Sequence, residues 1–123
     1  MKKISKTWKA SKSPRKQRKF LFNAPLHLKN KMVCSHLSEE LRKKYNTRGI
    51  RVRTGDKVKV LRGQFKGKTG KVEKINTLKA KAYVTGIEVV KRDGSKALYP
   101  IHSSNLLITD LNLSDKKRIE VKK

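Results

Sequence analysis

The sequence has little negative charge. Only 9 of its 123 residues are Asp or Glu, against 34 Lys and Arg, so the formal net charge is +25 at pH 7. A chain with this charge repels itself unless an anionic partner neutralises it. The few acids are scattered, and no Ser/His/Asp grouping or phosphate-binding glycine loop accompanies them. We therefore expect a nucleic-acid-binding protein and not an enzyme.

Long hydrophobic runs and cysteine pairs are also missing. No stretch approaches the roughly 18 apolar residues of a transmembrane helix, and no apolar signal region follows the basic start. The single cysteine, Cys34, excludes an internal disulfide. Cys34 with His36 supplies two ligands where a structural zinc site takes four. These absences predict a soluble, intracellular protein with no membrane insertion, metal, cofactor or small-molecule substrate.

The positive charge divides the chain into four parts. Residues 1–36 contain 11 Lys and Arg and no acid, which is typical of an RNA-binding extension. We expect a short helix and linker over 37–54, a small barrel over 55–111, and a basic tail over 112–123. Because the extension has few apolar residues, something external is expected to order it, and its composition points to RNA or DNA.

Two helices are expected before the barrel. Ser13 and Pro14 form a helix start, so a helix is predicted from Pro14 to about Phe22, and Pro25 prevents its continuation. Ser38, followed by two glutamates, predicts a second helix near 38–45. The tail carries a similar start signal for a short helix at Ser114.

Alternation of period two begins at Arg51 and predicts a mainly β fold. Five short strands in about 57 residues favour a small barrel over a larger sandwich. Asp93-Gly94 is a strong hairpin signal, and a bulge near Glu73 is needed to keep both Val72 and Ile75 inside. The expected strands are 57–61, 69–75, 80–92, 96–101 and 105–109. The expected core consists of Val58, Val60, Phe65, Val72, Ile75, Val84, Ile87, Val89, Leu98, Ile101, Leu106 and Ile108.

The loop between the first two strands is rich in glycine and lysine. Gly63 and Gly67 permit positive φ and a close approach of the backbone to a partner. Lys66 and Lys68 flank Gly67, so a phosphate could lie between them, although the lysines could instead be merely solvated. The neighbouring acid-free extension favours binding.

This segment resembles the KOW motif, and blocks outside it resemble one ribosomal protein family. That family is the archaeal and eukaryotic branch of the large-subunit protein numbered twenty-four in bacteria, and the blocks look archaeal. They are Arg15–Lys19, Asn23–Leu28, Leu37–Tyr45 and Tyr99–His102. The resemblance implies an SH3-like β-barrel with N- and C-terminal extensions. It implies a cytoplasmic ribonucleoprotein that binds large-subunit rRNA near the nascent-peptide tunnel exit, touches neighbouring ribosomal proteins, and supports subunit assembly and translation.

The candidate RNA-binding residues are the cations of the extension and barrel, two histidines and the loop glycine. They are Lys12, Arg15, Lys16, Arg18, Lys19, His27, Lys29, Lys31, Arg42, Lys43, Arg51, Arg53, Arg62, Lys66, Gly67, Lys68, Lys71 and His102. For His27 and His102 a structural role is as well supported as RNA contact. Lys2 to Lys12 is expected to be extended until it meets phosphates, and Trp8 either stacks on a base or packs within the protein.

Two other functions compete with this interpretation. A KOW-containing transcription elongation factor would bind RNA polymerase, but such proteins usually carry a further domain and a less basic KOW module. A cationic membrane-surface protein needs a helix with a continuous apolar face, which the extension lacks.

Overall fold

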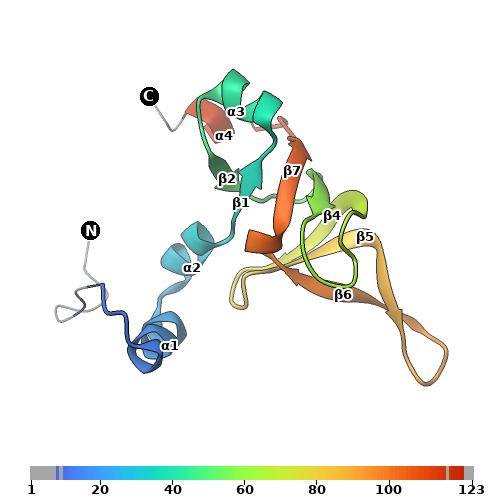
Figure 1. Cartoon of the computed structure of the whole chain (residues 1–123), viewed down its shortest axis with the longest axis horizontal. Helices are drawn as coiled ribbons and strands as arrows, with labels where there is room; N and C mark the ends of the chain where they lie inside the picture. The colour runs from blue at the N-terminus through green and yellow to red at the C-terminus, as the bar shows by residue number, and fades with distance from the viewer. Residues whose placement is uncertain (1–7, 9, 116, 121–123) are drawn as a thin grey trace.

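The computed structural model describes residues 8, 10–115 and 117–120, and it is mainly β (Figure 1). Seven strands form one sheet in the order β2-β1-β7-β3-β4-β5-β6. This is a small SH3-like barrel domain, as predicted, but the sheet does not close, so β2 and β6 remain as edges. The strands are β1 (Cys34–Leu37), β2 (Gly49–Arg51), β3 (Lys57–Val60), β4 (Thr69–Asn76), β5 (Lys81–Val90), β6 (Lys96–His102) and β7 (Leu106–Asp110).

The helices lie outside the sheet. They are α1 (Pro14–Asn23), α2 (Leu26–Met32), α3 (Glu39–Tyr45) and α4 (Lys117–Glu120), with a 3₁₀ turn η1 (Ser103–Asn105). In Figure 1, α1 and α2 stand to one side, whereas α3 and α4 lie together at the end of the sheet near β2. None of the described helices is long and apolar enough to cross a membrane.

Helix α2 is absent from the prediction, which treats Pro25 only as a helix stop. Pro25 is also the N-cap of α2, with φ −67°, and its carbonyl accepts from the N–H groups of Leu28 and Lys29. A proline at the start of a helix sacrifices no intrahelical hydrogen bond. The same residue therefore ends one helix and begins the next.

The five predicted strands are present as β3 to β7, but the prediction missed β1 and β2, which also join the sheet. Strand β1 pairs in parallel with β7, with His36 opposite Leu107, and antiparallel with β2. Val33, which precedes β1, and Leu37, which ends it, are both buried in the core. The predicted boundary after residue 36 thus falls inside a core strand.

Most of the predicted core is confirmed. Phe65 and Ile75 are only partly buried against it, and Leu98 is half-exposed. The prediction that Val89 is a core residue is wrong, because Val89 is 41% exposed. The reason is that β5 and β6 continue past the barrel as a projecting hairpin (Figure 1), beyond a register irregularity between Tyr83 and Glu88. The core gains Val33, Leu37, Val52, Ala82 and Leu111.

The two local irregularities expected in the sheet are present. The pairing of β4 with β5 shifts register between Val72 and Lys74, which is the expected bulge. Gly94 has φ +81° at the tip of the β5–β6 hairpin, where Lys91 and Ser95 are joined by a backbone hydrogen bond. Both features follow from local sequence alone.

A buried ion pair fastens the tail to the barrel. Asp56 accepts from the backbone N–H groups of Arg53 and Asn112, so it satisfies backbone donors as a turn aspartate is expected to do. Both terminal nitrogens of Arg118 donate to the two Asp56 oxygens at 2.6 Å. Arg118 also donates to the carbonyls of Arg51 and Asn112. Arg118 thereby anchors helix α4 to the turn at Asp56.

Candidate nucleic-acid interface

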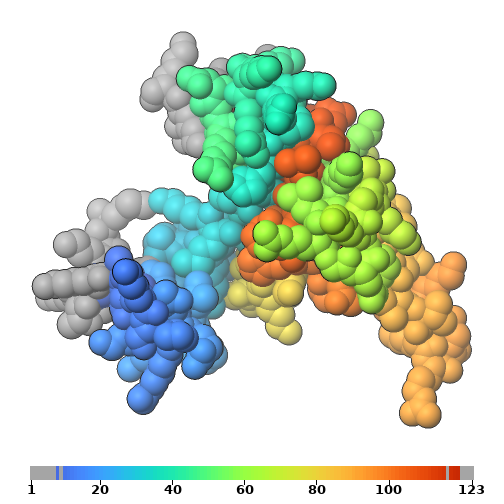
Figure 2. All heavy atoms as spheres, in the orientation of Figure 1, coloured from blue at the N-terminus to red at the C-terminus, as the bar shows by residue number. Residues whose placement is uncertain are grey.

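Helix α1 presents four cations to solvent. Arg15, Lys16, Arg18 and Lys19 are all exposed, and within the described ranges none of them forms a salt bridge. The helix has no buried residue and no acid in its first turn. Figure 2 shows it as a projection on the side of the molecule opposite the β5–β6 hairpin. The fold thus holds this charge away from the core.

The segment that precedes α1 differs from one expectation and agrees with another. Ser13 is the N-cap, but its side chain makes no capping hydrogen bond. The Trp8 ring stacks on Phe20 at a centroid distance of 4.4 Å and an interplanar angle of 17°, which agrees with the packing alternative. The predictions for Lys2 to Thr7 and for Lys9 lie outside the described residues.

The loop between β3 and β4 leaves its backbone accessible. Gly63 and Gly67 have φ +90° and +87°, and a Cβ added at either position would meet no atom within 4 Å. The Gly67 N–H donates to Val60, which fixes the loop against the end of β3. Lys66 and Lys68 are exposed on both sides of Gly67. This geometry can accept a phosphate that approaches closely between two ammonium groups.

An aromatic pair lies beside this loop. The rings of Phe65 and Tyr99 are 5.1 Å apart and tilted by 55°, and Lys68 Nζ lies 5.3 Å from the Phe65 centroid. The two aromatic rings border a hollow of about 140 Å³, which Arg62, Lys81 and His102 also line. Aromatic faces next to cations can stack unpaired bases and bind their phosphates.

His102 has a structural function at the edge of this hollow. Its Nδ1 accepts from the Ser104 N–H and lies 2.9 Å from the Ser104 hydroxyl, so it caps η1. Burial lowers the pKa of His102 below its usual 6.5, and the charge of Lys81 lowers this pKa further. The imidazole is therefore mostly neutral at pH 7.

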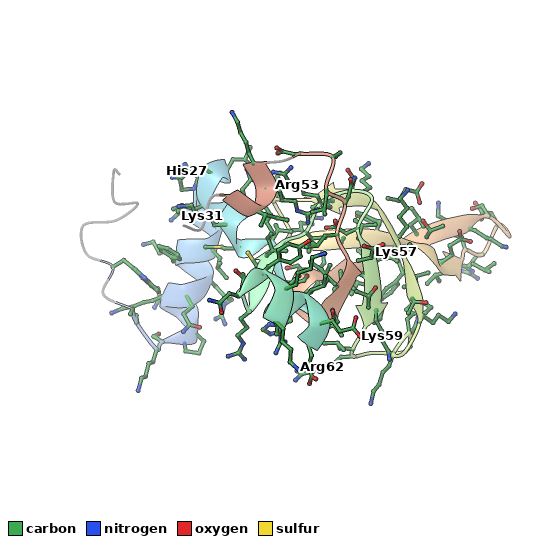
Figure 3. The ribbon with its side chains drawn as sticks, turned by 90° about the horizontal axis from the view of Figure 1, so that it is seen from above. His27, Lys31, Arg53, Lys57, Lys59 and Arg62 are labelled. Atoms are coloured by element: carbon green, nitrogen blue, oxygen red, sulfur yellow. The ribbon has the colours of Figure 1, made fainter. Side chains whose placement is uncertain are left out.

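The outer face of β3 carries two lysines that are not among the predicted RNA-binding residues. Lys57 and Lys59 are exposed because they alternate with the buried Val58 and Val60. Lys57 lies opposite the predicted Lys71 on β4, and its ammonium is 3.6 Å from Asp110. Figure 3 shows Lys57 and Lys59 with Arg62, which follows at the end of the strand. The strict alternation of the sequence is sufficient to predict that both side chains face outward.

Four predicted cations are already bonded within the protein. Arg53 donates to Asp115 at 2.7 Å, and this hydrogen bond lowers the pKa of the Asp115 carboxyl. The other three donate to Phe22 O (Lys29, 3.2 Å), Leu37 O (Arg42, 2.7 Å) and Asn30 Oδ1 (Arg51, 3.0 Å). These side chains help to hold the fold, whatever else they contact.

A larger groove gathers three predicted residues. His27 and Lys31 reach it from α2 and Arg51 from β2, and its volume is about 570 Å³. Lys12, Arg42 and Lys43 line neither this groove nor the aromatic hollow. Over the described ranges, no group of three or more His, Cys, Asp or Glu is placed to hold a metal ion. The polar and aromatic side chains that line the groove and the hollow include cations, aromatic rings and amides.

Comparison with known families gives a match over nearly the whole chain. The matching family comprises the ribosomal proteins L26 of eukaryotes and their archaeal counterparts, which carry the number twenty-four, and it covers residues 11–122.

Proposed function

Because the chain belongs to this family of eukaryotic L26 and related archaeal ribosomal proteins, we propose that it works by binding rRNA. Membership makes it a component of the large ribosomal subunit in the cytoplasm, and it implies a structural role. The predicted family is therefore confirmed, and the elongation-factor alternative is not favoured. What its side chains contact in the subunit is the subject of the proposal.

The observation that carries the proposal is the placement of unpaired positive charge. Helix α1 exposes four cations that no described acid neutralises, and the β3–β4 loop exposes two more around Gly67. Lys and Arg that neutralise phosphates release counterions, and this release supplies sequence-independent affinity. We propose that the helical segment before β1 is the RNA-binding extension and that the barrel positions the loop.

We further propose that this binding occurs near the exit of the nascent-peptide tunnel, beside other ribosomal proteins, and that it supports subunit assembly. The family resemblance supports this placement. Contacts from an extension and from a barrel on one chain would join separate rRNA segments. Shape and backbone would govern most of those contacts, as is usual for RNA helices.

The salt dependence of binding to large-subunit rRNA tests the first proposal. Each neutralised phosphate contributes roughly −0.7 to −0.9 to the slope of log K against log salt. Replacing the four α1 cations Arg15, Lys16, Arg18 and Lys19 with Ala should make this slope shallower by about 3. The matched control replaces four exposed cations outside the proposed interface, Lys74, Lys91, Arg92 and Lys96. Equal slopes for both variants would contradict a phosphate contact by α1.

Chemical footprinting of rRNA in reconstituted large subunits tests the placement. Nucleotides protected by the protein should cluster around the tunnel exit. Protection of nucleotides elsewhere would contradict the proposed location near the tunnel exit but not the proposal that the protein binds rRNA.

A further inference from the structure

The groove between α2, β2, α3 and α4 combines an apolar wall with a cationic rim. Its apolar lining comes from Leu37, Tyr45, Ile50, Leu111 and Ile119. Its volume of about 570 Å³ is within the range of roughly 300–1,000 Å³ that is typical of small-molecule sites. The groove is therefore large enough for one nucleotide.

The polar side chains around the groove are basic or neutral. Lys31 and His27 lie one helical turn apart on α2, as Figure 3 shows, and both are exposed. Arg51 reaches across from β2 and is held by its hydrogen bond to Asn30, which also lines the groove. No Asp or Glu is among the described lining residues. The rim therefore favours an anionic ligand.

The far wall of the groove is formed by the fastened tail. Arg118 and Ile119 line it, and Arg118 is fixed by its buried bonds to Asp56. Tyr45 of α3 also lines the groove and is half-buried, with Lys44 Nζ 5.5 Å from its ring centroid. Side chains of both α3 and α4 thus contribute to the groove, and Arg118 is fixed there by its ion pair with Asp56.

We infer that this groove binds an unpaired nucleotide of RNA. The base lies against the apolar wall beside Tyr45, and its phosphate is bound by Lys31 and Arg51, with His27 at the rim. Single-stranded RNA is recognised in this way, by base stacking together with a basic backbone track. The inference rests on the proposed rRNA binding and adds a site that duplex RNA cannot fill, because its bases remain stacked in the helix.

The alternative occupant is an apolar peptide of a neighbouring protein. Such a peptide could lie along the free edge of β2. The cationic rim without acids favours the nucleotide, because an apolar peptide would leave these charges without a partner. The experiment below separates the two occupants.

Cys34 offers a direct test, since it is exposed, lines the groove and is the only cysteine of the chain. The rate at which N-ethylmaleimide modifies it is measured on the full chain, alone and saturated with either of two RNAs. One is a 12-nucleotide oligo(A), and the other is a 12-base-pair RNA duplex. Oligo(A) should slow the modification several-fold, whereas the duplex, which supplies phosphates but no free base, should slow it little.

A filled groove provides the second test. Thr47 lines the groove, and Thr47→Trp adds bulk there without changing the charge. We expect it to weaken oligo(A) binding several-fold with an unchanged salt slope and unchanged duplex binding. The matched control is Thr54→Trp, at an exposed turn position outside the groove.

Three results would overturn the inference. In the first, both RNAs protect Cys34 equally. In the second, oligo(A) binds with its normal salt slope but leaves Cys34 fully reactive, which would spare the proposed rRNA binding. In the third, RNA leaves Cys34 reactive but the assembled large subunit protects it, which would assign the groove to a protein neighbour. If neither RNA nor large-subunit rRNA binds at all, the proposed function fails together with the groove.

Discussion

Replacing Arg118 should destabilise the whole domain, although Arg118 lies close to the C-terminus. The side chains of Arg118 and Asp56 are 2% and 0% exposed, and two hydrogen bonds of 2.6 Å join them. Removing one partner of a buried ion pair leaves the other charge uncompensated, at a cost of about 3–5 kcal/mol. A domain of this size has a total stability of about 5–15 kcal/mol. Arg118→Met should therefore remove a large share of the free energy of unfolding, as urea denaturation would show.

An exposed ion pair in the same region serves as the control. Arg53 and Asp115 are joined at a similar distance, 2.7 Å, but their side chains are 42% and 44% exposed, so water screens the pair. Arg53→Met should cost much less than Arg118→Met. In a double-mutant cycle, Asp56→Asn with Arg118→Met should cost less than the sum of the single variants. Equal losses for Arg53→Met and Arg118→Met, or strict additivity in the cycle, would refute the reasoning.

Three further predictions concern the interface. The double variant Lys66→Ala, Lys68→Ala should keep its stability within about 0.5 kcal/mol, because both side chains are exposed, and should bind rRNA more weakly. Melting and binding measured on one preparation check this, and the double variant Lys91→Ala, Lys96→Ala is the charge-matched control. NMR titration should give His102 a pKa below 6.5 in the free protein and a higher pKa with RNA, since a phosphate favours the imidazolium. Because the folded pKa is lowered, the stability that His102 contributes is present above pH 6.5 and is lost as the pH falls from there through the folded pKa. An unshifted pKa would contradict the burial argument. Amide hydrogen exchange in the free protein should be fast in α1, which buries no residue, and slow in and next to β1, where Leu37 and the preceding Val33 are in the core. Equal protection of the two segments would mean that α1 is stabilised independently.

Local patterns predicted those parts of the fold that local interactions determine. Alternation along β3 identified Val58 and Val60 as core residues, and the same alternation implies that Lys57 faces outward. The Asp93-Gly94 turn was predicted correctly because its backbone requires a residue with positive φ. Periodicity reports which side chains share a face, and this information was sufficient for the barrel strands.

Non-local partners explain the errors. Strand β1 contains only four residues, and its place in the sheet depends on β7, near the other end of the chain. Val89 follows the alternation of a core residue, but periodicity does not indicate where the barrel ends and the projecting hairpin begins. Arg118 resembles the solvated cations around it in sequence, and only the folded turn at Asp56 makes it a buried structural residue.

In the candidate site, too, residues of one continuous segment could be predicted, whereas residues brought together from different elements could not. The sequence predicted the α1 cations and the loop around Gly67, because these are continuous segments. It did not predict that His27, Lys31 and Arg51 border one groove, since α2 was missed and Arg51 lies on a different element. The sequence also did not predict that Lys81 and Tyr99 line the aromatic hollow, because they reach it from β5 and β6.

The parallel pairing of β1 with β7 has a consequence for how the protein is made. During synthesis, β1 leaves the ribosome before its partner β7, because His36 and Leu107 lie far apart in the sequence. The core therefore cannot close before β7 has emerged, and this pairing raises the contact order of the fold. Until β7 is released, the basic segment that precedes β1 hangs from an unfolded chain. Incomplete translation products would consequently carry the cationic helix without the barrel that positions it.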